Sequence, residues 1–172
     1  MTAQATRRDA TRFIALAAAI ALAVFAADGL TKTMAASALA LGDTYDVVPG
    51  WLVFTHVRNT GAAYGLLAGY GWLLLPISVA VAVFVPIVVW RAGLWQAQPV
   101  VGGLAAGLIF GGALGNLVER AQSGSVTDFI QVPHIALFQV FNVSDAAICV
   151  GAALLLLLST TRSSSAAAPE SG

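Results

Sequence analysis

The fold of this chain is decided by the stretch FNVSDAA, residues 141–147, and by the apolar run that continues from it to Leu158. The run predicts a membrane-spanning helix over residues 143–161. Asp145 stands at the start of this helix, where a carboxylate is costly to desolvate unless it has a partner and a function. Asp145 is therefore the first candidate functional residue.

A second aspartate, Asp128, lies shortly before it in GSVTDFI, residues 124–130. The whole chain has only 8 acidic residues. Two carboxylates that meet in apolar surroundings can share one proton, so that one acts as an acid and the other as a base. We therefore predict that Asp128 and Asp145 form the catalytic pair of a membrane aspartic peptidase.

The composition places the chain in lipid. Hydrophobic residues make up 59% of its 172 residues, charged residues only 9%, and the mean hydropathy is +0.86. A soluble domain has about 25% charged residues. The net charge of +0 predicts no nucleic-acid-binding surface, and the single cysteine, Cys149, excludes an internal disulfide.

The apolar runs predict an all-α membrane protein, one integral membrane domain over residues 1–172. The first run, after the basic residues of the N-terminus, also fits a cleavable signal peptide, but three further apolar runs favour a membrane helix. Residues 162–172 are rich in Ser and Ala and predict a disordered cytoplasmic tail. The four expected membrane-spanning helices cover residues 12–33, 72–90, 100–118 and 143–161.

Residues 34–70, between the first two helices, form the longest polar-leaning stretch. Residues 51–57 are rich in β-branched and aromatic side chains and predict a strand. With its aromatic residues, the segment predicts a small extracytoplasmic β-sheet on the outer leaflet. His56 falls within the strand and is expected to be structural or solvent-facing. Residues 121–141 predict a loop with strand-like character.

Basic residues set the expected topology. If the chain crosses four times, one side receives Arg7, Arg8, Arg12, Arg91 and Arg162. The positive-inside rule makes this side, with both termini, cytoplasmic. The outer face then receives both aspartates together with Asn59, Asn116, Arg120 and Asn142. This convergence of polar residues at one membrane face predicts a site.

Two further features come from helix spacing. Asp28 and Lys32 are four residues apart and can pair on one helix face, either to anchor the helix or to orient the active site. The third helix carries six glycines between Gly102 and Gly115, and small residues let membrane helices pack closely. It ends in GGALGNLVER, residues 111–120, with polar residues where it leaves the membrane.

Five segments together resemble the lipoprotein signal peptidase family, also called signal peptidase II, from Asp28 to the fourth helix. The family usually has Asp where this chain has Glu119, and Ala where it has Ser144. Both departures spare the aspartate pair. In order, the segments are DGLTK (28–32), NTGAAY (59–64), GGALGN to Arg120 (111–120), GSVTDF (124–129) and FNVSD (141–145).

The resemblance implies an endopeptidase of the bacterial plasma membrane that removes signal peptides from prolipoproteins. It implies cleavage just before a lipobox cysteine that already carries diacylglyceryl, inhibition by globomycin-type cyclic peptides, and no metal or organic cofactor. Membrane lipid is an expected partner, and a monomer is expected. Asp128 and Asp145 take the catalytic role. The residues implied around the substrate and the pair are Asn59, Gly112, Asn116, Arg120 and Asn142, supported by Asp28 and Lys32.

Other functions fit less well. A proton-coupled transporter would carry polar residues through the full membrane depth, but the inner halves of these helices, such as residues 154–158, have no charge. A scaffold protein leaves both aspartates unexplained. Aspartic peptidases of presenilin or prepilin type would show Gly-x-Gly-Asp, and a metal site at Asp128 and His134 lacks a His-x-x-x-His spacing.

Overall fold

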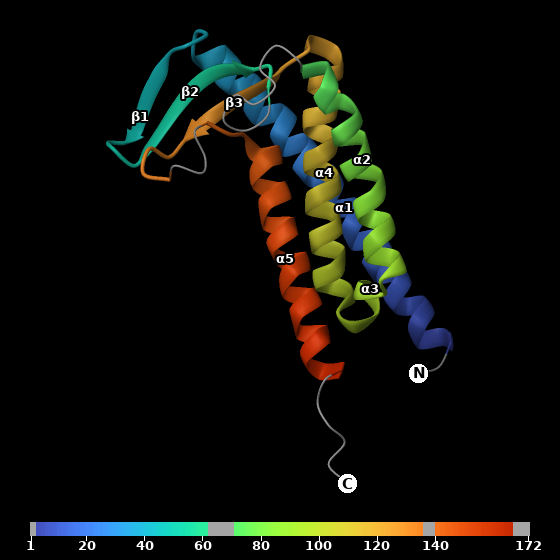
Figure 1. Cartoon of the computed structure of the whole chain (residues 1–172). Coiled ribbons are helices and arrows are strands. Elements are labelled where there is room, and N and C mark those ends of the chain that lie inside the picture. Colours follow the sequence, from blue (N-terminus) through green and yellow to red (C-terminus); the bar gives the residue numbers. More distant parts are fainter. Residues whose placement is uncertain (1–2, 62–70, 136–139, 167–172) are drawn as a thin grey trace.

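The computed structural model describes residues 3–61, 71–135 and 140–166. The helices stand side by side, and a small sheet lies across one end of them (Figure 1). The helices are α1 (Ala3–Ala38), α2 (Gly71–Arg91), α3 (Leu94–Ala97), α4 (Pro99–Ser123) and α5 (Val143–Ala166); the strands are β1 (Thr44–Val48), β2 (Leu52–Asn59) and β3 (Val126–Gln131).

Four of the described helices, α1, α2, α4 and α5, are long and apolar enough to cross a membrane. The predicted fold class, a four-helix membrane protein with a small sheet, is confirmed. The helices extend further than predicted: α1 begins at Ala3 and ends at Ala38, because these flanking residues include good helix formers and no proline. Residues 162–166 of the predicted tail belong to α5, and the rest of that tail lies outside the described residues.

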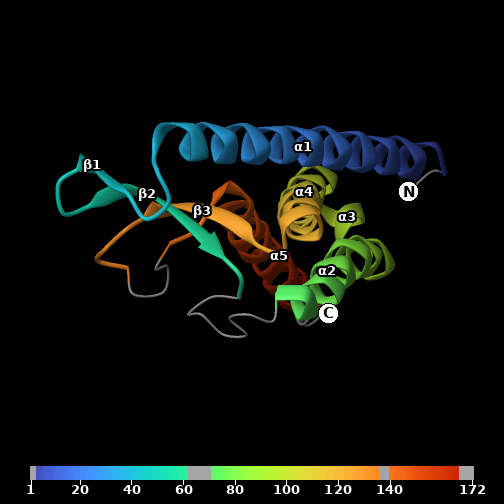
Figure 2. The ribbon, with the colours of Figure 1, turned by 90° about the horizontal axis from the view of Figure 1, so that it is seen from above.

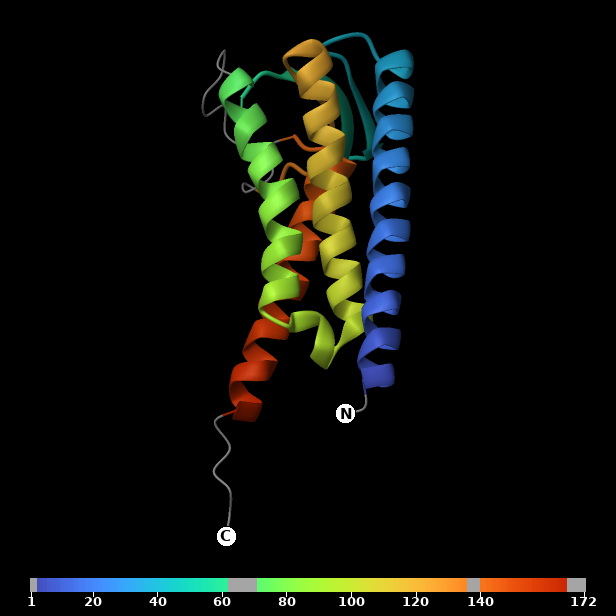
Figure 3. The same ribbon diagram turned by 90° about the vertical axis from the view of Figure 1, so that its right-hand side faces the viewer.

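Helix α4 is the centre of the bundle. It packs between α1 and α2 and also contacts α5 (Figures 2 and 3). Gly103, Gly107 and Gly111 recur every four residues on its face toward α1. A Cβ atom on each would lie 3.0, 2.6 and 2.6 Å from a carbonyl oxygen of α1, so only glycine allows this approach. The predicted packing role of these small residues is confirmed.

The sheet has the order β1-β2-β3, with both pairs antiparallel. Strands β1 and β2 come from the predicted segment between α1 and α2. Strand β3 comes from the segment between α4 and α5, for which we predicted a loop with strand-like character. Its pairing aligns Val57 with Asp128 and Asn59 with Val126. The sheet thus brings two distant parts of the sequence together beside Asp128.

The two ends of the bundle differ in chemistry. At the end away from the sheet, where α1 begins and α5 ends, Phe13 packs against Trp90 and Trp95, whose rings stack at 4.7 Å. At the sheet end, polar side chains are buried between β3, α4 and the start of α5. His56 contributes to the sheet's attachment, since its Nδ1 lies 2.9 Å from the carbonyl oxygen of Leu39. Its predicted structural role is confirmed.

Candidate active site

The first turn of α5 fixes Asp145. Its backbone N–H donates to Oδ1 of Asn142 at 3.0 Å, and its Oδ2 accepts the backbone N–H of Asn142 at 3.2 Å. This reciprocal arrangement is a capping box, with aspartate in place of the usual glutamate. The carboxylate therefore lies at the positive end of the helix dipole, which stabilises a negative charge.

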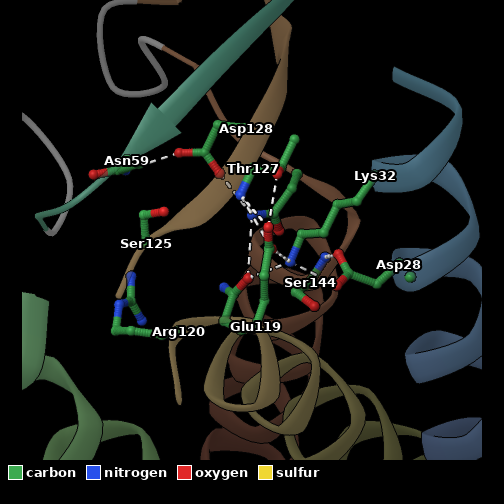
Figure 4. Close-up of polar contacts among 12 residues, drawn as sticks. Asp28, Lys32, Asn59, Glu119, Arg120, Ser125, Thr127, Asp128 and Ser144 are labelled. Atoms are coloured by element: carbon green, nitrogen blue, oxygen red, sulfur yellow. Dashed lines mark hydrogen bonds and ion pairs between the residues drawn. The ribbon is translucent and has the colours of Figure 1, made fainter. Parts of the chain in front are cut away.

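Strand β3 presents Asp128, which is only 2% exposed, to the same asparagine. Asn142 donates its Nδ2 to Asp128 Oδ1 at 2.7 Å, and Asn59 on β2 donates its Nδ2 to Asp128 Oδ2 at 2.8 Å. Figure 4 shows Asp128 beside the end of β2, with Asn59 pointing at it. Asn142 thus contacts both aspartates, and it is itself fully buried.

The surroundings of Asp128 favour its protonated form. Burial raises the pKa of Asp128 to about 7, and the negative charge of Asp145 adds to this rise. The hydrogen bonds from Asn59 and Asn142, and the charge of Lys32, oppose the rise in pKa. Because the two carboxylates interact, they titrate as a unit, and the pair holds a proton at a pH where isolated aspartates are ionised.

Asn116 of α4 links the pair to α1. Its Nδ2 donates to Asp145 Oδ1 at 2.7 Å, and its Oδ1 accepts from Lys32 Nζ at 2.9 Å. Lys32 also forms the predicted ion pair with Asp28, at 2.7 Å. Asp28 in turn accepts the backbone N–H of Ser144 at 2.9 Å, at the start of α5. The anchoring and orienting roles predicted for Asp28 and Lys32 are therefore both supported by contacts.

Sequence reasoning missed a second group of residues. In the sequence, Glu119 stands out only as a departure from the family pattern. In the structure it accepts hydrogen bonds from Thr127 and forms ion pairs with Lys32 and Arg58. In Figure 4 Glu119 and Thr127 lie between Asp128 and Lys32. The separation of Glu119 and Thr127 along the sequence gives no sign of their contact, because the contact forms only when β3 folds back over the end of α4.

Arg120 is buried but weakly bonded. One guanidinium nitrogen lies 3.4 Å from the carbonyl oxygen of Gly61, and its Nε has no hydrogen-bond partner among the described residues. A buried donor without a partner costs about 1–3 kcal/mol. Arg120 therefore has donor capacity left for another molecule.

Gly112 lies where α4 contacts the first turns of α5. A Cβ atom there would lie 2.5 Å from the carbonyl oxygen of Ser144 and 2.9 Å from a carbon of Ile148, so Gly112 is a packing contact between α4 and α5. The hydroxyl of Ser144 lies against Gly115 and, within the described residues, has no hydrogen-bond partner.

The structure thus joins seven of the nine predicted site residues in one network of hydrogen bonds. Arg120 lies beside this network and Gly112 lies in the helix contact beneath it. Across residues 3–61, 71–135 and 140–166 there is no group of three or more His, Cys, Asp or Glu residues suited to hold a metal ion. The seven connected residues are Asp28, Lys32, Asn59, Asn116, Asp128, Asn142 and Asp145.

Comparison with known proteins shows which family the chain resembles. Residues 20–161 match the family model described as signal peptidase (SPase) II. Proteins named lipoprotein signal peptidase from Bacillus velezensis and Bacillus subtilis are each 38% identical over 136 residues, which is 78% of this chain and 87% and 86% of theirs. One from Listeria monocytogenes is 36% identical, again over 78% of this chain and 86% of that protein.

Two solved structures, both described as bacterial membrane enzymes, have the same fold. One is 30% identical with a TM-score of 0.78, covering 93% of this chain and 96% of the other. The second is 32% identical with a TM-score of 0.70, covering 84% and 92%. The family model, the curated relatives and the shared fold all agree, and the chain belongs to the signal peptidase II family.

Proposed function

We propose that Asp128 and Asp145 are the catalytic acid and base with which this enzyme removes the signal peptide from prolipoproteins. The observation that carries the proposal is the position of Asn142, which holds Asp128 through its side chain at 2.7 Å and Asp145 through its backbone at 3.2 Å. A single buried residue thereby bonds to both carboxylates.

The pair can perform peptide hydrolysis as follows. The ionised aspartate takes a proton from a water molecule, and the water oxygen bonds to the carbonyl carbon of the scissile peptide. The protonated aspartate donates to the carbonyl oxygen, so a neutral gem-diol forms. The C–N bond then breaks as the aspartate that took the water proton gives it to the leaving nitrogen, while a hydroxyl of the gem-diol returns a proton to the other aspartate. The products are a carboxylate and a free amine.

We propose that the substrate is a prolipoprotein whose cysteine already carries diacylglyceryl, cut just before that cysteine. The family supports this substrate, and the exposed aromatic side chains of the sheet, such as Tyr45 and Trp51, support a place at the lipid surface. We propose that Arg120, whose Nε has no hydrogen-bond partner in the part of the chain that the structure describes, binds a substrate carbonyl. Globomycin-type peptides would block the same site, and the enzyme would act as a monomer.

We also propose that the sheet and the aspartate pair face the outside of the bacterial plasma membrane. The start of α1, the end of α2 at Arg91 and the end of α5 lie together away from the sheet (Figure 1), and the positive-inside rule would make this side cytoplasmic. The other three spans, α1, α2 and α5, all contact α4, as the helices of one membrane domain would. A cysteine introduced as Asp46→Cys in a Cys149→Ala background should react with a membrane-impermeant maleimide in intact cells; labelling only after lysis would reverse the orientation.

The catalytic assignment is tested by Asp128→Asn and Asp145→Asn. Because an amide can neither accept a proton from water nor donate an acidic one, each change should abolish cleavage of a diacylglyceryl-modified prolipoprotein by the purified enzyme. The two losses should be similar, since paired groups act as a unit. Asp46→Asn is the matched control, because Asp46 is exposed on β1 and should leave cleavage unchanged. Cleavage near the wild-type rate by either variant of the pair would refute the assignment.

A further inference from the structure

Glu119 holds β3 at the residue that precedes Asp128. Both oxygens of its carboxylate accept the backbone N–H of Thr127 at 3.0 Å, and Oε1 also accepts the Thr127 hydroxyl at 2.7 Å. Hydrogen bonds to a charged acceptor are among the stronger ones in proteins. The end of α4 is therefore attached to the backbone and the side chain of one residue of β3.

The regular pairing of β2 with β3 ends at Asp128. Val57 faces Asp128, and the register shifts between Phe54 and Val57, immediately beyond this pair. A bulge interrupts the regular hydrogen bonds of a ladder and bends the strand. Asp128 thus lies at the edge of the regular pairing, and Glu119 holds the residue before it.

The same carboxylate also reaches the second aspartate through Lys32. Lys32 Nζ lies 3.1 Å from Glu119 Oε2, and it donates to Asn116 Oδ1 at 2.9 Å. An amide whose oxygen faces a lysine must turn its NH₂ group the other way, and here that group donates to Asp145 at 2.7 Å. Glu119 therefore contacts Thr127, the neighbour of Asp128, and also Lys32. Lys32 in turn orients Asn116, which binds Asp145.

We propose that Glu119 is a positioning residue, which fixes Asp128 through Thr127 and Asp145 through Lys32 and Asn116, and so sets the arrangement of the two catalytic carboxylates. The proposal rests on the catalytic role of Asp128 and Asp145 given above. Glu119 touches neither carboxylate in the described contacts, so its effect on catalysis is indirect. Arg58, whose guanidinium lies 2.9 Å from Glu119 Oε1, balances part of its charge.

The test compares Glu119→Gln and Glu119→Asp with the wild type in detergent or bicelles. Glu119→Gln keeps the size but loses the charge, and its NH₂ group cannot accept the N–H of Thr127. Because a misplacement of about 1 Å can cost about 100-fold in rate, we expect kcat to fall about 10- to 100-fold with KM changed less than about twofold. Glu119→Asp keeps the charge and should recover activity to within about tenfold of the wild type.

Two further variants separate positioning from folding. Thr127→Val removes one hydrogen bond to Glu119 and leaves the Glu119 carboxylate in place. It should therefore lower kcat by less than Glu119→Gln does. Asp9→Asn removes a carboxylate that pairs only loosely with Arg12, at 4.0 Å, near the start of α1, and should not change kcat. All rates are expressed per folded enzyme, measured by size-exclusion chromatography and thermal unfolding.

Three outcomes would overturn the proposal: an unchanged kcat in Glu119→Gln, a loss confined to KM, or a loss that disappears when rates are expressed per folded enzyme. If Glu119→Gln does not fold, an unchanged kcat in Thr127→Val overturns it equally. These failures differ from a failure of the catalytic assignment, which shows itself only as activity in Asp128→Asn or Asp145→Asn.

Discussion

The buried lysine of α1 offers the sharpest test of how the site is held together. Lys32 is 6% exposed and contacts Asp28 at 2.7 Å, Glu119 at 3.1 Å and Asn116 at 2.9 Å. Lys32→Met keeps the length of the side chain and removes the charge. It leaves Asp28, which is 1% exposed, without any cation among the described ion pairs, whereas Glu119 keeps Arg58.

The expected cost follows from these partners. Removing one member of a buried ion pair destabilises a protein by about 3–5 kcal/mol, because the other charge is left uncompensated. For a chain of this size, 1 kcal/mol shifts the melting temperature by about 2–4 °C, so Lys32→Met should lower it by about 6–20 °C. Most of the loss should come from Asp28, since Glu119 remains paired.

The double variant Lys32→Met with Asp28→Asn isolates this contribution. Asn at position 28 is uncharged, and its oxygen can still accept the N–H of Ser144 that Asp28 now binds. The double variant should therefore recover more than half of the lost stability. It should not recover full activity, because Asn116 still lacks the lysine that orients it toward Asp145.

The assay is a double-mutant cycle on thermal unfolding in detergent and on cleavage rate. The reasoning would be refuted by a Lys32→Met variant that loses less than about 1 kcal/mol, or by a double variant no more stable than the single one. Full activity in the double variant would show that Lys32 anchors the helix and does not orient the site.

Two more predictions concern packing and pH. Gly115→Ala should destabilise the protein by about 1–3 kcal/mol and slow cleavage, because its Cβ would lie 2.7 Å from Asp28 and closer still to the Ser144 hydroxyl. The control is Gly29→Ala, whose Cβ would have nothing within 4 Å and which should be nearly neutral in thermal unfolding. The pKa of Asp128 lies above the 3.8 of an ordinary aspartate, at about 7, so protonation stabilises the fold at low pH and this contribution is lost as the pH rises through about 7. The melting temperature should therefore decline as the pH rises from about 3.8 to about 7 and level off above that, and Asp128→Asn should remove this decline. Cleavage should decline above about pH 7, where the pair loses its proton, and a cleavage rate that stays flat to pH 9 would contradict the prediction.

The sequence was sufficient to predict the helices, because each apolar run is long enough to span a bilayer and carries too few charges to face water. It was also sufficient for the Asp28–Lys32 pair, since four residues on a helix bring side chains to one face. It did not predict β3 as a strand, because strand pairing joins segments about 70 residues apart and leaves only a weak local pattern. The contacts of Glu119 and the bond from Asn59 to Asp128 depend on that strand. The contacts of Glu119 were therefore missed, and the expected topology placed Asn59 only on the same membrane face as the aspartates.

Gly112 shows why a residue can matter to a site that it does not touch. On α4, Gly112 and Gly115 lie against the first turn of α5, where a side chain at either position would meet Ser144. That turn carries Asp145 and, through Asn142, also holds Asp128. The close approach of α4 to α5 therefore sets how far Asn116 stands from Asp145. Asp28 reaches the same turn of α5 from α1 and accepts the backbone N–H of Ser144. Because Asn116 on α4 bonds to Asp145 at 2.7 Å and Asp28 on α1 bonds to Ser144 at 2.9 Å, the packing of α1 and α4 against α5 also fixes the arrangement of the carboxylates.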